Sequence, residues 1–262
     1  MKYLQRHLIN ARSFLQYPAR NIIWIANEVI FYLIMPFVWL SIIAQKGPIV
    51  GYDGSAIITY YILVAAIISA ADSKSGSAIT TDIVEGGLSK VLVRPVHYLS
   101  LTTTFEYVYR IVSFIIIFFV FVPAHFLLPQ YITFPSFLNL LIFIPSLILS
   151  FFIAHTIQII SGLLAFWFGR NRLITNTIWL GTTLLSGSVA PLDFYPSWIR
   201  FIAAHSPFYY MAYFPIAIYQ GRLCGSFVIT QFIIGLSWIL FFSVIIFFLW
   251  NNGIKRYEGS GI

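Results

Sequence analysis

The stretch IVEGGLSKVLVRP, residues Ile83–Pro95, interrupts a chain that otherwise consists mostly of long apolar runs. It combines charged side chains with two adjacent glycines and an Arg-Pro pair. We expect a short helix here, with its N-cap at one of three residues that favour that position, Thr80, Thr81 or Asp82. Gly86 and Gly87 would loosen or break this helix.

After the two glycines, Leu88, Val91 and Leu92 follow the i, i+3, i+4 spacing of one helix face, and Pro95 ends the helix near Val93. A short helix with an apolar strip needs something to cover that strip. Two coverings remain open: the protein's own helix ends or lipid headgroups, and a groove on a cytoplasmic partner.

Composition explains what surrounds this stretch. Of the 262 residues, 60% are hydrophobic and 9% are charged, whereas an ordinary soluble domain is about 25% charged. We therefore predict an integral membrane protein rather than a large soluble core. We then expect the basic residues behind the net charge of +7 to orient the chain in the bilayer rather than to bind nucleic acid. The single cysteine, Cys224, excludes an intramolecular disulfide.

Six apolar runs are long enough to be candidate spans of an all-α, single-domain membrane protein covering residues 1–262. They are 22–44, 55–71, 108–128, 138–168, 173–190 and 226–250. The fourth is longer than a span requires, so we expect it to be tilted, broken near Pro145 or extended beyond the bilayer. The first is expected to be an uncleaved anchor.

Lys and Arg give the orientation. If the N-terminus is cytoplasmic, twelve of the 15 basic residues lie inside, and only Lys46, Arg200 and Arg222 lie outside. This asymmetry predicts a multi-pass protein of the cytoplasmic (inner) membrane with both termini inside. Six spans satisfy that requirement.

Two further segments do not span. Residues 1–20 place leucines at helical spacing and predict an amphipathic helix on the inner surface, with an irregular basic tail as the alternative. The outer segment, 191–225, is rich in aromatics and prolines. Pro196 and Pro207 predict two short helices, at 196–205 and 207–220, that enter the outer leaflet and return; a folded cap at the interface is the alternative.

Motifs for catalysis are missing from the sequence. We find no HExxH, no GxSxG and no Gly-Lys pair of a phosphate-binding loop, so ATP, if used, must bind another chain. Two intramembrane polar residues deserve a functional hypothesis, Glu28 and His155. For Glu28 a structural ion pair is at least as good an interpretation, and for His155 a packed residue bonded to a neighbouring helix is the better one.

Together, the stretch Ile83–Pro95 and the later SGSVAPLDFYPSWIRFIAAHSPFYYMAYFPIAIYQG resemble the ABC-2 type family of ABC transporter permeases. The first segment matches at Ile83, Gly86, Leu88, Leu92, Arg94 and Pro95. The second matches at Ser186, Gly187, Pro191, Leu192, Phe194, Pro196, Trp198, Pro207, Phe208, Pro215 and Gly221. Length, six spans and inner termini agree over the whole chain.

The resemblance implies a cytoplasmic coupling helix after span two, paired re-entrant helices at an outer gate after span five, and a substrate pathway lined by spans one, two and five. Coupling would fall to Ile83, Glu85, Gly86, Gly87, Leu88, Val91, Leu92, Arg94 and Pro95. Outer-gate residues would be Pro191, Phe194, Pro196, Trp198, Pro207, Phe208 and Tyr209.

It also implies partners: a second six-span permease, identical or related, two cytoplasmic ATPase subunits, and membrane lipid. No cofactor is expected in this chain, because ATP and Mg would bind the ATPase. The expected function is export of a hydrophobic or amphipathic substrate by a transport subunit that is not itself an enzyme. The rival functions are a secondary carrier, a membrane-embedded lipid-modifying enzyme and an accessory immunity subunit.

Overall fold

The computed structural model describes residues 32, 34–71, 75–94, 97–103, 126, 129–170 and 172–257. Within these ranges the chain is helical, with no strand and one isolated β-bridge, between Ile49 and Tyr52. The predicted all-α class is therefore confirmed. Five predictions fall wholly or partly outside the described residues: the helix at 1–20, the span at 22–44 for residues 22–31 and 33, Glu28, Pro95 and, except for Phe126, the span at 108–128.

The helices that precede the outer segment are Ile34–Lys46, α3 (Gly54–Ala71), α4 (Ser75–Val84), α5 (Ser89–Leu92), a helical stretch at 98–103, α7 (Phe137–Leu163), α8 (Ala165–Phe168) and α9 (Arg172–Leu185). The remaining elements are η1 (Leu192–Phe194), α10 (Ser197–His205), η2 (Pro207–Met211), α11 (Tyr213–Tyr219), α12 (Ser226–Gly253) and η3 (Ile254–Arg256).

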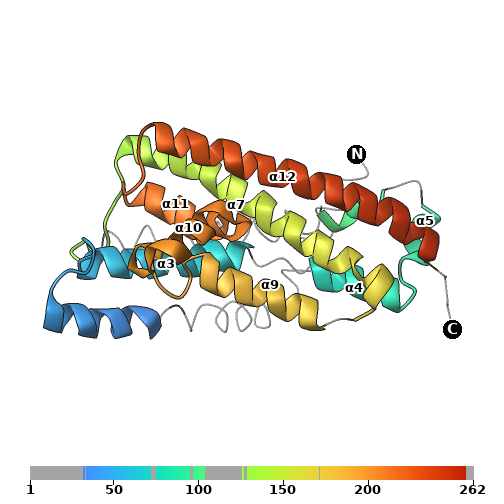
Figure 1. Ribbon diagram of the computed structural model, residues 1–262, viewed down its shortest axis with the longest axis horizontal. Coiled ribbons are helices and arrows are strands. Elements are labelled where there is room, and N and C mark those ends of the chain that lie inside the picture. The colour runs from blue at the N-terminus through green and yellow to red at the C-terminus, as the bar shows by residue number, and fades with distance from the viewer. Residues whose placement is uncertain are drawn as a thin grey trace.

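Two helical stretches in the described part of the chain are long and apolar enough to cross a membrane, Phe137–Phe168 and Ser226–Arg256. Shorter apolar helices are Ile34–Lys46 and Gly54–Ile68. In Figure 1, α7 and α12 lie side by side along the long axis of the molecule. α4, α5 and the end of α12 gather at one end, here called the α5 end, while α7 and α12 begin at the opposite end.

The predicted fourth and fifth spans need correction. Pro145 lies inside α7 and does not break it; the helix is interrupted instead at Leu164, before α8. The fifth helix ends at Leu185 rather than Ala190. It ends there because Gly187 adopts a φ of 81°, a left-handed conformation that glycine tolerates, and its carbonyl accepts a 2.6 Å hydrogen bond from the Tyr60 hydroxyl.

Two clusters of buried side chains hold the helices together. The larger one joins α3, α7, the outer segment and α12, and its largest fully buried members include Tyr52, Tyr60, Tyr210 and Phe214. The smaller one, here called the end cluster, lies at the α5 end. Its buried members are Ile79, Ile83, Leu88, Tyr98, Ile159, Leu163 and Ala165.

Candidate functional site

The short helix α5 is the first candidate site, and the glycines before it determine its position. Gly86 has a φ of 77°, which ends α4 and reverses the chain. A Cβ on Gly87 would lie 2.6 Å from the Asp82 carboxylate, so this position needs glycine because of close packing. The pair is thus a helix break rather than a helical segment.

The helix before the break begins earlier than predicted. α4 starts at Ser75, so Thr80, Thr81 and Asp82 lie inside it and none is its N-cap. Their polar groups have other partners: the Thr80 hydroxyl donates to the carbonyl of Gly76 at 2.9 Å, and Asp82 accepts from the Tyr98 hydroxyl at 2.7 Å. Local spacing could not reveal the contact with Tyr98, which belongs to another helix.

The predicted apolar strip on α5 is divided between two environments. Leu88 is 0% exposed and belongs to the end cluster, and Val91 packs against that cluster half-buried. Leu92 is 44% exposed and Val93 is 84% exposed. The first covering considered for the strip therefore applies to part of it: Leu88 packs on the protein's own helices, which removes it from any partner surface. Leu92 and Val93 stay exposed, and their covering by a groove on a partner stays a prediction.

Polar contacts attach the α5 segment to helices far away in sequence. Glu85 forms an exposed ion pair with Arg170, in the turn after α8. The Ser89 backbone N–H donates to the Tyr257 hydroxyl at 3.2 Å, and the Ser89 and Tyr257 hydroxyls lie 2.9 Å apart. Arg94 is exposed. Ile83, by contrast, is buried in the end cluster together with Leu88.

The outer segment is the second candidate site, and the predicted helix at 196–205 corresponds to α10. The predicted helix at 207–220 is instead two elements, η2 and α11, separated at Ala212. The predicted gate residues of the outer segment differ widely in exposure. Pro191 and Tyr209 are buried, Phe194, Pro207 and Phe208 are half-buried, and Pro196 and Trp198 are exposed.

Several of these side chains serve packing between helices. The Phe194 ring lies 4.7 Å from the Trp39 ring and 5.1 Å from the Tyr52 ring, measured between centroids. Phe208 packs on Gly181 of α9, where an added Cβ would lie 2.7 Å from the Phe208 ring. The outer segment is therefore built into the helical core rather than standing apart from it.

Asp193 is a central residue of this segment that sequence reasoning missed. Its Oδ2 accepts hydrogen bonds from the Tyr52 hydroxyl at 2.8 Å and from the Tyr213 hydroxyl at 2.9 Å. Bonds to a carboxylate are stronger than those between neutral groups. Asp193 is the only acid between residues 186 and 225, which was the available signal. It joins the start of α3 to the start of α11.

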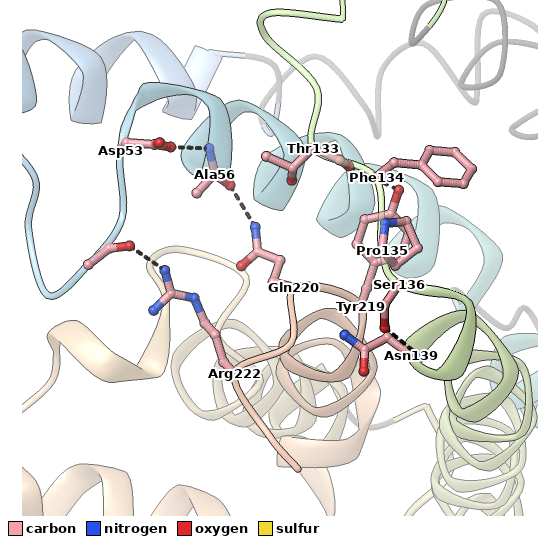
Figure 2. A pocket seen from close by; sticks show the side chains of 11 residues that line it. Asp53, Ala56, Thr133, Phe134, Pro135, Ser136, Asn139, Tyr219, Gln220 and Arg222 are labelled. Carbon is pink, nitrogen blue, oxygen red and sulfur yellow. Dashed lines mark hydrogen bonds between the residues drawn. The ribbon is translucent and has the colours of Figure 1, made fainter.

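A cavity of about 280 Å³ lies at the opposite end from α5 (Figure 2). Three loops line it together with the ends of α3, α7 and α11 that adjoin them, at residues 51–56, 133–139 and 219–222. Arg222 reaches the first loop: its Nη2 donates to the Gly51 carbonyl at 2.8 Å, and its guanidinium lies 3.3 Å above the Tyr52 ring. The Gln220 amide donates to the Ala56 carbonyl at 2.7 Å. These polar groups join the loops to one another.

Asp53, also on the cavity wall, is the N-cap of α3. Its Oδ1 accepts from the Ala56 backbone N–H at 2.7 Å and from the Ser55 hydroxyl at 2.8 Å. These hydrogen bonds, that of Ala56 first, hold the pKa of the Asp53 carboxyl below its usual value. Asp53 is thus an ionised structural cap.

His155 has a structural environment. It is buried in α7, its Nε2 lies 3.1 Å from the Thr103 hydroxyl on another helix, and its ring stacks on Phe151 at 5.8 Å. This is the packed arrangement preferred for it from the sequence. Among the described residues, no group of three or more His, Cys, Asp or Glu side chains could hold a metal ion.

Comparison with known proteins gives one family. The family described as "ABC-2 family transporter protein" matches residues 29–261, which includes both candidate sites. No curated protein matches the chain.

Proposed function

The chain belongs to the ABC-2 family of transporter proteins, and from that membership we propose that it is the six-span permease subunit of an ATP-driven exporter. The family is that of a membrane transport component, which is not itself catalytic. The sequence contains no Gly-Lys pair and hence no phosphate-binding loop. The proposal therefore assigns ATP hydrolysis to a separate subunit that docks on this chain.

The observation that carries the proposal is the exposed apolar surface of α5. Leu92 and Val93 project from a segment that connects helices at one end of the molecule, where charge counting expects the cytoplasm. Val84, at the end of α4, is 43% exposed and adds to the same kind of surface. An apolar groove on a cytoplasmic ATPase would cover these side chains.

Tight packing behind α5 supports its role in transmitting movement. A Cβ on Gly162 of α7 would lie 2.7 Å from the Ile79 side chain and 2.8 Å from the Gly76 carbonyl, so α4 and α7 touch backbone to backbone. Close-packed interfaces transmit displacement rather than absorbing it. A movement of α5 and α4 on ATP binding would therefore displace α7.

At the opposite end, the outer segment would act as the exit gate. Asp193 and Arg222 attach it to the loop before α3, so we expect it to move together with α3. α9 has no buried residue, and it exposes Leu173, Trp179 and Leu180 beside polar side chains at 175–177. We propose that this mixed surface faces the pathway between two permease subunits, which favours an amphipathic or hydrophobic substrate.

The test replaces Leu92 and Val93 with Asp in the full-length chain and measures the ATPase subunit that copurifies with it. We expect copurification to fall about tenfold or more, because charge placed in an apolar interface loses its hydration. Tyr131→Asp is the matched control, since Tyr131 is 47% exposed and lies in a loop before α7. Undiminished copurification of the double variant would refute docking at α5, and absence of any ATPase from the parent preparation would refute the proposed function.

A further inference from the structure

We propose that Tyr257 is a positioning residue that links α5 to α12, so that movement of α5 reaches the last span as well as α7. The inference rests on the proposed function, because it assigns a second route for the movement that the ATPase would start. It concerns a residue outside both motifs that carry the family resemblance.

The contacts of Tyr257 join two segments that are 168 residues apart. Its hydroxyl accepts from the Ser89 backbone N–H at 3.2 Å and lies 2.9 Å from the Ser89 hydroxyl. Its ring meets Phe166 edge to face, with centroids 6.3 Å apart. Tyr257 follows η3, which directly continues α12, so the hydroxyl is carried by the end of that helix.

α5 depends on such contacts because it is only four residues long and its N-cap, Leu88, makes no side-chain hydrogen bond. A helix of one turn does not hold together in isolation. Leu88 attaches it to the end cluster, and Ser89 attaches it to Tyr257. The end cluster contains Ile159 and Leu163 of α7, and Leu249 and Trp250 of α12 pack against it, so the Ser89–Tyr257 contact adds a polar link to α12 beside this apolar packing.

The end of α12 is packed tightly against its neighbours, so it would move together with α5. Trp250 stacks on Tyr98 with centroids 5.6 Å apart and rings inclined by 6°. A Cβ on Gly253 would overlap the Phe166 ring, so α12 approaches α8 closely here. From this end α12 runs as one continuous helix of 28 residues to Ser226 at the opposite end of the molecule (Figure 1).

The chain carries its own probe for movement at that far end. Cys224 is its single cysteine, it is exposed, and it lies two residues before α12 begins. Its rate of reaction with a membrane-impermeant maleimide therefore reports the surroundings of the distal end of α12, with no other thiol in this chain to react.

The first experiment tests the link without the ATPase. In the purified full-length chain, Tyr257→Phe keeps the ring but removes the hydroxyl. We expect amide hydrogen exchange in residues 83–94 to rise about fivefold, the factor that corresponds to one net hydrogen bond. Ser89→Ala should have a smaller effect, because the Ser89 N–H still donates, and should add nothing to Tyr257→Phe. Exchange unchanged in Tyr257→Phe would overturn the inference.

The second experiment uses the complex with its copurifying ATPase, with and without ATP, and follows maleimide labelling of Cys224. We expect ATP to change the labelling rate about twofold or more in the parent, and Tyr257→Phe to reduce that change clearly while ATP hydrolysis continues, because only the apolar packing on the end cluster then links α5 to α12. Ser237→Ala is the control, since it removes an exposed hydroxyl of α12 that donates to the Ile234 carbonyl of its own helix. An ATP response that is undiminished in Tyr257→Phe, or is absent from the parent, overturns the inference. Absence of the ATPase from the parent preparation would instead refute the proposed function.

Discussion

Replacing Leu88 with Ala tests whether α5 has an inner and an outer face. Leu88 is fully buried in the end cluster, whereas Leu92, one turn later, is 44% exposed. Truncating a buried leucine to alanine lowers the free energy of unfolding by about 2–5 kcal/mol, depending on how far the surrounding side chains collapse into the space. The end cluster is small and lies at one end of the molecule, so we expect its side chains to fill part of the space. We therefore expect Leu88→Ala to destabilise the α5 segment by about 3 kcal/mol.

Local opening of α5 would then increase by roughly 100-fold, since each 1.4 kcal/mol is a factor of about ten. Leu92→Ala should change the same free energy by at most about 0.5 kcal/mol, which is at most roughly a twofold effect. Hydrogen exchange of peptides covering residues 83–94, measured on the purified full-length protein, gives both values.

The difference in hydrogen exchange between Leu88→Ala and Leu92→Ala tests whether Leu88 anchors α5. Equal exchange in Leu88→Ala and Leu92→Ala would mean that α5 is not anchored through Leu88, and the division of the strip between core and partner would be wrong. Leu88→Met, which conserves volume, should stay close to the parent. A large effect from that variant would show that the side chain is not simply packed.

Two predictions concern the opposite end. Asp193→Asn should lower thermal stability by about 2 kcal/mol, because the Tyr52 and Tyr213 hydroxyls lose a charged acceptor; an unchanged unfolding temperature would show that the carboxylate does not join these elements. Asp53→Ala should cost about 1 kcal/mol, reduced by solvent screening because this cap is largely exposed. The pKa of the Asp53 carboxyl is lower in the folded state than in the unfolded state. Its stabilisation of the fold is therefore complete above the unfolded-state pKa and is lost as the pH falls through the folded-state pKa. The unfolding free energies of parent and variant should then converge in acid. A difference that persists at low pH would contradict the ionised cap.

Several features could be read directly from local sequence, because they depend on the chemistry of neighbouring residues. The apolar runs at 55–71 and 226–250 coincide with α3 and α12, and Pro196 does precede a short helix. Gly86 and Gly87 do break the helix. Of the three alternatives for the fourth span, a break near Pro145 is the one that the structure contradicts, since this proline lies within a continuous helix.

Other features were decided by tertiary structure. Spacing placed Leu88 and Leu92 on one strip, but only the neighbouring helices determine that the first is covered and the second is not. Asp193 meets Tyr52 across 141 residues, and Ser89 meets Tyr257 across 168. Sequence alone therefore determined where this protein is apolar and that the chain breaks at Gly86 and Gly87. Which side chains join those helices followed only from their packing, because such contacts depend on distances in space that no local pattern encodes.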